Sequence, residues 1–177
     1  MISFSVRNAI FTTYFAEMAV HKLSIDDFEE VNYELIAIHT SLEDYHLAYS
    51  INQKLPILLS KNKDEIQTKN KDGEAWFSRF TYENSENGVT WNLIRNKIEI
   101  LTPKKDTSRN LFADNSQEIA TRVYLLSEFK KVDYFLKIEN AEESAEKIVA
   151  ALHTVGKIST IYTVNADQIK SKNNLIF

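Results

Sequence analysis

The sequence predicts an α+β domain in which two helices pack on an antiparallel sheet. Short β-favouring runs alternate with two helix-like runs, and an Asn-Gly pair joins two longer strand-like runs near the middle of the chain. One strand–helix–strand unit lies on each side of this turn. Since a sheet needs its apolar face covered, this order of elements indicates a layered fold.

The first unit begins with the run YELIAIHT, residues 33–40, which is short and apolar enough for a buried strand. Ser41 then begins a variant of the capping box, in which its hydroxyl accepts from the backbone N–H of Asp44. A helix is therefore expected from Leu42 to about Lys54, and Pro56 ends it. The apolar stripe of this helix comprises Tyr45, Leu47, Ala48, Tyr49 and Ile51.

The middle of the chain is expected to form a hairpin. Residues 76–83 and 89–101 have the pattern of two strands, and both residues of the Asn87-Gly88 pair between them tolerate positive φ. The neighbouring segments are shorter or more polar: we expect strands at 57–60 and 123–126 and loops at 61–74 and 103–117.

The second unit has the clearest helix signal. Residues 134–139 are predicted to be a strand, after which Asn140 caps a helix with Glu143 at the capping-box position. Gly156 follows where a left-handed C-terminal cap favours glycine, and 158–164 is the last strand. The helical spacing is carried by Ala145, Ile148, Val149 and Leu152.

A short internal similarity links the two units. The run VNYEL at 31–35 resembles VDYFL at 132–136, and each leads into a strand and then a helix. Either duplication or chance explains the match. Two such units around an antiparallel hairpin are what a ferredoxin-like or ACT-like sandwich requires, and we predict that sandwich with or without duplication.

The length of 177 residues suits one domain, which we place at residues 18–177. Met18 begins a run that reads like a natural start, so residues 1–17 are expected to be an extension outside the core. The N-terminal stretch lacks both the basic start and the long apolar middle that are typical of a signal peptide. It has no cysteine, which fits a soluble protein of a reducing cytoplasm.

Composition excludes several classes of enzyme. The only glycines are Gly73, Gly88 and Gly156, too far apart for a phosphate-binding loop, a dinucleotide fingerprint or a nucleophile elbow. The absence of cysteine removes thiolate nucleophiles and cysteine-bound metals. The net charge of −4 argues against nucleic acid and anionic lipid as partners. We expect no cofactor.

The run LSEFKKVDY at 126–134 resembles the signature of the IPExxxVDY family, small proteins of Bacteroidetes with no assigned activity. Glu128, Val132, Asp133 and Tyr134 match this signature, whereas Ser127 replaces its proline. The resemblance extends from about Met18 to the C-terminus. It implies a bacterial cytoplasmic protein and supplies no catalytic residues.

Two interpretations of the signature stay open. In the structural one, Asp133 hydrogen-bonds backbone amides and Tyr134 packs in the core. In the functional one, Glu128 and Asp133 form part of a surface for a ligand or partner. The presence of Ser127 in place of the proline favours the structural interpretation, since this replacement removes only the fixed φ that proline provides.

The densest cluster of functional residue types lies at the end of the first strand and the start of the first helix. His39, Glu43 and His46 are candidate binding residues there, with Asp44 between them. Two histidines and a carboxylate can hold a divalent metal, but this spacing matches no established motif, and we predict no metal site. Capping and the helix dipole account equally well for the two carboxylates.

Three further features have a structural and a functional interpretation each. The adjacent pair Glu142-Glu143 is typical of solvated charge, although paired carboxylates can also do acid–base work. Aromatic residues of the predicted sheet can pack in the core or stack on RNA bases; they include Phe77, Tyr82 and Trp91. The apolar ending LIF, residues 175–177, either docks as a last strand in its own chain or exchanges with a neighbour.

These observations favour a non-enzymatic binding or protein-interaction module, with a protein partner, a homodimer or a small-molecule ligand. An enzyme with an unfamiliar site around His39–His46 is the first alternative. An RNA-binding accessory protein is the second.

Overall fold

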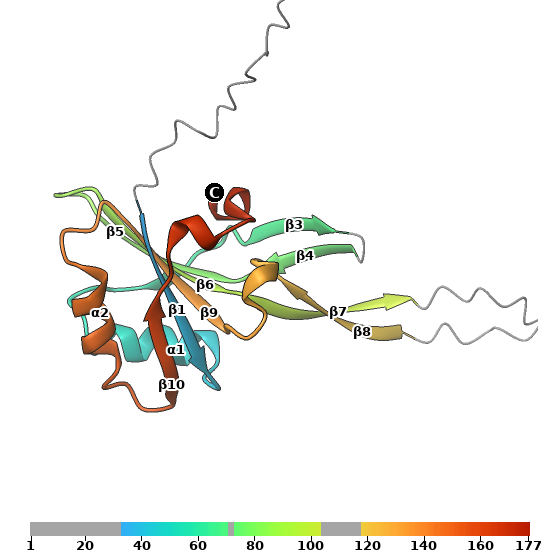
Figure 1. Ribbon diagram of the computed structural model, residues 1–177, viewed down its shortest axis with the longest axis horizontal. Helices are drawn as coiled ribbons and strands as arrows, with labels where there is room; N and C mark the ends of the chain where they lie inside the picture. The colour runs from blue at the N-terminus through green and yellow to red at the C-terminus, as the bar shows by residue number, and fades with distance from the viewer. Residues whose placement is uncertain (1–32, 71–72, 104–117) are drawn as a thin grey trace, which may run out of the picture. The chain divides into compact units, whose positions relative to one another are not determined.

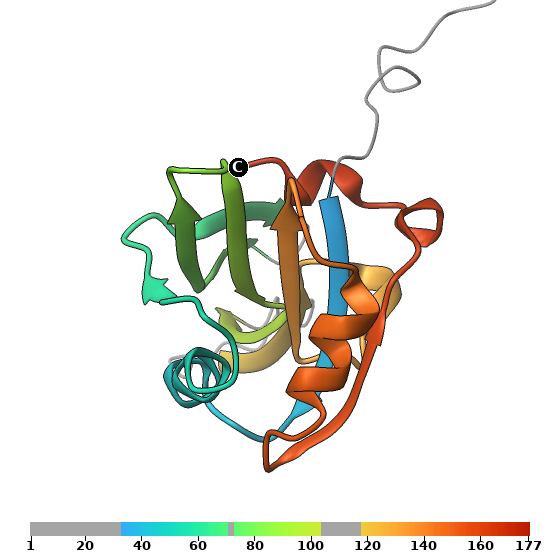
Figure 2. The ribbon, with the colours of Figure 1, turned by 90° about the vertical axis from the view of Figure 1, so that its left-hand side faces the viewer.

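The computed structural model describes residues 33–70, 73–103 and 118–177, which belong to one unit, Val31–Phe177. This unit contains an antiparallel six-stranded sheet with the strand order β10-β1-β9-β6-β5-β2 (Figures 1 and 2). The predicted α+β class, with an antiparallel sheet and two helices, is confirmed. The expected extension at 1–17 and residues 104–117 of the expected loop lie outside the described residues.

The elements follow the chain in alternating order. The sheet consists of β1 (Tyr33–Thr40), β2 (Ser60–Lys61), β5 (Arg79–Asn84), β6 (Val89–Arg95), β9 (Tyr134–Glu139) and β10 (Ile158–Thr163). Two separate ribbons pair β3 (Ile66–Asn70) with β4 (Gly73–Phe77) and β7 (Lys97–Pro103) with β8 (Glu118–Tyr124). The helices are α1 (Asp44–Asn52) and α2 (Ala145–Leu152), with short 3-10 helices η2 (Ser127–Phe129), η3 (Ala166–Gln168) and η4 (Lys172–Leu175).

Strand β1 lies inside the sheet, next to the edge strand β10, and is buried on both faces. It pairs with β9 and β10, so that Ile36 lies opposite Leu136 on one side and Thr163 on the other. Ile36 and Ile38 pack in the core beneath the helices, whereas Leu35 and Ala37 pack in a second core on the opposite face. Burial on both faces explains why this strand is a continuous apolar run rather than an alternating one.

Both helices cover one face of the sheet (Figure 1). Helix α1 buries only Leu47, Ala48 and Ile51, so Tyr45 and Tyr49 of the predicted stripe lie exposed instead. Helix α2 buries Ala145, Ile148 and Leu152 of its predicted stripe, whereas Val149 is only partly buried. Among the described residues, no helix is long and apolar enough to cross a membrane.

The two ribbons and the C-terminal segment cover the opposite face. The residues that these segments contribute to the second core include Ile66, Phe77, Val123, Ile169 and Leu175. The polar run expected to be a loop at 61–74 therefore contains β3 and the start of β4. The strand expected at 123–126 also begins earlier, at Glu118, because it pairs with β7 along its length.

The two strands predicted around the hairpin are each interrupted by one buried polar residue. Ser78 divides β4 from β5, and Asn96 divides β6 from β7. At these points each strand leaves the main sheet and enters a ribbon, while the N–H of Arg95 still donates to the carbonyl of Ser78. The position of the turn is confirmed, but it spans the four residues 85–88, and of the Asn-Gly pair only Gly88 has a positive φ, of 71°.

Helix α1 is shorter than predicted and is not capped by Ser41. The helix begins at Asp44, after Glu43. The hydroxyl that turns the chain is that of Thr40, one residue before the predicted Ser41, and it accepts from the N–H of Leu42. The segment predicted to be a strand at 57–60 pairs only at Ser60, although Ile57 and Leu59 are buried.

The caps predicted for α2 are wrong by a few residues. The helix begins after Ser144, and Asn140 instead turns the chain with a φ of 54° and donates to the carbonyl of Gly88. The left-handed conformation after the helix falls on Lys157, with a φ of 70°, rather than on Gly156. There the hydroxyl of Thr40 donates to the Lys157 carbonyl over 2.8 Å, which holds this turn to the end of β1.

The C-terminal segment docks within its own chain as a 3-10 turn, η4, rather than as the last strand that the first of its two interpretations predicted. Leu175 is 1% exposed, and its carbonyl accepts from the buried ammonium of Lys137 over 2.7 Å. The ring of Phe177 lies 4.8 Å from that ammonium and 4.6 Å from the guanidinium carbon of Arg79. Ile176 remains exposed.

Candidate functional site

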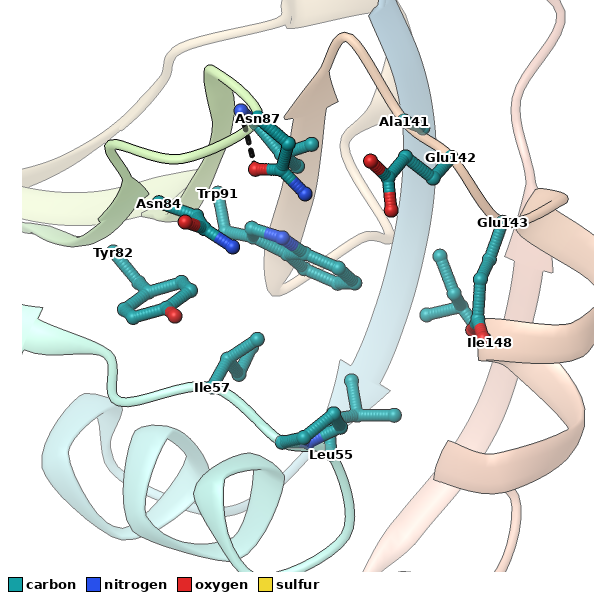
Figure 3. Close-up of a pocket in the computed structure, with 12 residues that line it drawn as sticks. Leu55, Ile57, Tyr82, Asn84, Asn87, Trp91, Ala141, Glu142, Glu143 and Ile148 are labelled. Carbon is teal, nitrogen blue, oxygen red and sulfur yellow. Dashed lines mark hydrogen bonds between the residues drawn. The ribbon is translucent and has the colours of Figure 1, made fainter.

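A groove of about 210 Å³ lies on the helical face of the sheet (Figure 3). Its floor is formed by the β5–β6 hairpin, one side by the segment after α1, and the other by the segment that leads into α2. The lining residues are Leu55, Pro56, Ile57, Tyr82, Asn84, Asn87, Val89, Trp91, Ala141, Glu142, Glu143 and Ile148. Three segments that are distant in sequence therefore form one concave surface.

The floor of the groove is aromatic. Tyr82 and Trp91 are paired across β5 and β6, so both side chains project from the same face of the sheet. Both are half-buried, with Leu55 and Ile57 beside them in Figure 3. An apolar floor of this kind binds the flat or aliphatic part of a ligand.

Polar groups surround this floor. The side-chain oxygens of Asn84 and Asn87 accept from the N–H groups of Glu86 and Val89, at 3.0 and 3.2 Å. The amide nitrogens of these two asparagines form no hydrogen bond with any described residue. They are therefore available to donate to an acceptor on a ligand.

The only charged residues that line the groove are Glu142 and Glu143, and both are exposed. Neither carboxylate forms an ion pair or a hydrogen bond within the part of the chain that the structure describes. Both lie just before the first turn of α2, where the positive end of the helix dipole favours carboxylates. The groove thus combines an aromatic floor with a negative rim.

The predicted candidates His39 and His46 lie on opposite faces of the sheet. His39 follows Ala37 in the alternation of β1, and its ring stacks on Tyr162 at 5.8 Å, on the face away from the helices. His46 is exposed on α1, where its ring lies 4.2 Å from that of Tyr45. The structure therefore does not bring the two imidazoles to one site.

Glu43 and Asp133 do line one small cavity, of about 110 Å³, at the end of β1. Arg95 approaches Glu43 at 3.7 Å, and Lys97 forms an ion pair with Asp133. The other carboxylate oxygen of Asp133 accepts from the N–H of Thr40 at 3.0 Å. Each carboxylate in this cavity is thus matched by a cation of the same chain.

Glu128 fastens the C-terminal segment to η2. One of its oxygens accepts from the N–H groups of Lys170 and Ser171 at 2.7 and 3.0 Å, and the other accepts from the Ser171 hydroxyl at 2.6 Å. Burial raises the pKa of this carboxyl, but the hydrogen bonds from Ser171 and the backbone outweigh burial and lower its pKa overall.

The tyrosine of the signature is a core residue, as its structural interpretation predicts. Tyr134 is 3% exposed and donates its O–H to the carbonyl of Leu42 at 3.0 Å. Burial raises the pKa of Tyr134 to about 12, so it stays a hydrogen-bond donor at neutral pH. Tyr134, Asp133 and Glu128 each bind another segment of the chain. A ligand role for Glu128 and Asp133, or for His39, Glu43 and His46, stays a prediction.

Sequence reasoning named several groove residues but did not connect them. It treated Tyr82 and Trp91 as sheet aromatics and Glu142-Glu143 as a separate acidic pair. A two-residue turn at Asn87-Gly88 would place Tyr82 opposite Leu93. The observed turn has four residues, 85–88, and therefore places Tyr82 opposite Trp91. The pairing of β6 with β9, which brings the acidic pair to the same groove, has no local signal.

Among residues 33–70, 73–103 and 118–177, no group of three histidine, aspartate or glutamate side chains is placed to hold a metal ion. The aromatics considered for RNA stacking are also separated: Phe77 packs in the second core, away from Tyr82 and Trp91. Comparison of the chain with models of protein families, with curated proteins and with solved structures found no match.

Proposed function

We propose that this protein is a non-enzymatic binding module whose site is the groove between α1 and α2. The observation that carries this proposal is the paired aromatic floor of Tyr82 and Trp91, which is half-buried beside two amide nitrogens and two carboxylates that lack partners in the described chain. No histidine, serine, threonine or lysine lines the groove. The usual nucleophiles and proton-transfer groups are few there, which supports binding rather than catalysis.

The two tryptophans provide a matched test of this proposal. Trp76→Phe leaves Trp91 as the only indole, and Trp91→Phe leaves only Trp76, which lies half-exposed on β4 outside the groove. We expect small aromatic and amine fragments to change the fluorescence of Trp91 in the first variant with saturation. They should leave Trp76 in the second variant unaffected.

A response of equal size in both variants would indicate unspecific quenching and contradict the proposal. No saturable response of Trp91 to any fragment would contradict it as well. Thermal denaturation of both variants shows beforehand that each is folded.

We also propose that a second copy of the chain pairs with β10, which ends the sheet opposite β2. The six residues of β10 carry no charge or proline, features that normally protect an edge strand, whereas β2 is two residues long and carries Lys61. The N–H of Val164 donates to the carbonyl of Leu35, so the alternation of the ladder turns the N–H groups of Ile161 and Thr163 away from β1.

A twofold axis at Tyr162 fits this edge best. It pairs Ile161 with Thr163 of the second copy and avoids the irregular pairing between Ile158 and Thr160. Tyr162, which is 38% exposed, then lies opposite Tyr162 of the second copy, and the two Cα atoms are about 4.5 Å apart.

Because the chain has no cysteine, single-cysteine variants can test this register. Tyr162→Cys should form a disulfide-linked dimer under mild oxidation, since its Cα separation suits a disulfide. Thr160→Cys should not form such a dimer, because residue 160 lies opposite Val164 of the second copy and not opposite the second cysteine. A monomer by light scattering, or equal cross-linking of both variants, would contradict the dimer.

We also propose a fold relationship, a family and a cellular location for this protein. The order β10-β1-β9-β6, with α1 and α2 as the connections, supports a ferredoxin-like or ACT-like relationship. The contacts of Glu128, Asp133 and Tyr134 support membership of the IPExxxVDY family, whose signature would then hold three segments of the fold together. The absence of cysteine supports a cytoplasmic location.

A further inference from the structure

We infer that the groove binds the guanidinium group of an arginine side chain from a protein partner. This inference rests on the proposed function of the groove and names its ligand. It starts from the two carboxylates on the rim. Glu142 and Glu143 have no cationic partner among the described residues, and no lysine or arginine lines the groove. A ligand that completes this site electrostatically is therefore positively charged.

The floor distinguishes among cations. Trp91 and Tyr82 line the floor, and the face of an aromatic ring attracts a cation placed above it, most strongly in tryptophan. Guanidinium is flat and weakly hydrated, so it stacks on such a face and still directs its N–H groups outward in the ring plane. An ammonium group is more strongly hydrated and stacks less well.

The rim fits the same group. A guanidinium has five N–H donors, which can serve more than one carboxylate at once. Figure 3 shows Glu142 and Glu143 on the side of the groove nearest α2, across from Tyr82. An arginine that lies on the floor can therefore extend its N–H groups toward this rim.

The size of the groove favours a single side chain over a whole small molecule. Its volume of about 210 Å³ lies below the roughly 300 Å³ at which pockets for drug-sized ligands begin. The free amide nitrogens of Asn84 and Asn87 lie beside the floor and can donate to backbone carbonyls next to a bound arginine. We therefore place the arginine in a peptide segment of a partner.

The experiment uses the full-length Trp76→Phe protein and three probes. The first probe is the peptide acetyl-Gly-Gly-Arg-Gly-Gly-amide, and the second is the same peptide with citrulline, the neutral isostere of arginine. The third is butylguanidine, which carries the charge without a peptide. We expect the arginine peptide to quench Trp91 with a dissociation constant of about 1 mM or tighter. The citrulline peptide should bind at least about tenfold more weakly.

The carboxylates are tested with Glu142→Gln and Glu143→Gln, singly and together. The double variant should bind the arginine peptide about tenfold more weakly than the Trp76→Phe protein does. Its affinity for the citrulline peptide should be unchanged. Glu146→Gln is the matched control, because Glu146 is exposed in the first turn of α2 but does not line the groove. It removes the same charge near the same helix end and should leave affinity unchanged.

The outcomes separate this inference from the proposed function. Equal binding of the arginine and citrulline peptides would overturn the cationic ligand but support a binding groove. Binding of butylguanidine as tight as that of the peptide would overturn the peptide source. If neither peptide quenches Trp91 at up to about 5 mM, the inference is wrong; the fragment screen then decides separately whether the groove binds anything.

Discussion

Replacing Asn96 with leucine is expected to lower the free energy of unfolding by at least about 2 kcal/mol. Asn96 is fully buried where β6 passes into β7. Its side-chain nitrogen donates to the carbonyls of Phe129 and Val132 at 2.9 and 3.0 Å, and its oxygen accepts from the N–H of Leu126 at 2.9 Å. Leucine would leave the carbonyl of Val132 and the N–H of Leu126 without partners, at a cost of about 1–3 kcal/mol each, while the carbonyl of Phe129 would still accept from the N–H of Val132.

Asn92→Leu is the matched control, measured by urea denaturation alongside Asn96→Leu. Asn92 is also buried in β6, at 2% exposed, but its side chain has one hydrogen bond with the described residues, from the hydroxyl of Thr81 at 3.2 Å. We expect a loss of about 1 kcal/mol for this control. Equal losses in the two variants would show that the network around Asn96 does not stabilise the fold more than an ordinary buried amide does.

The same network explains why the sequence did not predict the bend in this strand. The partners of Asn96 are 30 to 36 residues further along the chain, between β8 and β9. Local propensity favours one continuous strand from 89 to 101, since most residues of this run other than Arg95, Asn96 and Lys97 are β-branched or apolar. The interruption is decided by tertiary hydrogen bonds that propensity does not contain.

Elements with strong local signals were predicted well. Strand β1 matches its predicted bounds, and so does β9, because each is an apolar run bounded by polar residues. The hairpin turn at Gly88 requires a positive φ, which the Asn-Gly pair provides. The antiparallel sheet with two helices follows from the order of these elements alone.

Helix ends were predicted less well because several polar residues compete for each cap. Ser41 and Asn140 both have the right chemistry, yet Thr40 and Ser144 occupy the turn positions. Thr40 is held by its contacts with Asp133 and Lys157, which are more than ninety residues away. A distant contact therefore decides which of two adjacent hydroxyl residues turns the chain.

The candidate site could be predicted only in part for the same reason. The chemistry of its residues is visible in the sequence: two aromatics in a hairpin and two carboxylates before a helix. Their meeting depends on β9 pairing with β6 across a connection that contains the β7–β8 ribbon. By contrast, His39 and His46 are close in sequence, but the alternation of β1 places His39 on the face away from the helices, whereas His46 lies on α1.

The second large effect concerns Glu128, which we expect to fasten the C-terminal segment. Glu128→Ala removes the acceptor for two backbone N–H groups and for the hydroxyl of Ser171. Since hydrogen bonds to a charged group contribute about 1.5–3 kcal/mol, we expect a loss of at least about 2 kcal/mol in the free energy of unfolding. Amide exchange at Lys170 and Ser171 should accelerate. Glu86→Ala, at an exposed turn position, is the control and should change neither quantity.

The charge of Glu128 also predicts how stability depends on pH. Its pKa in the folded protein lies below the ordinary value of 4.5, so the unfolded chain takes up the proton first as pH falls. Its contribution is therefore complete above that ordinary value and is lost as pH falls through the lower, folded pKa. Glu128→Gln keeps an oxygen for the two N–H groups but cannot titrate. The stability difference between wild type and Glu128→Gln should be largest at neutral pH and should shrink below about pH 4.5. A difference that stays constant down to about pH 3 would show that the carboxylate charge is not what stabilises this contact.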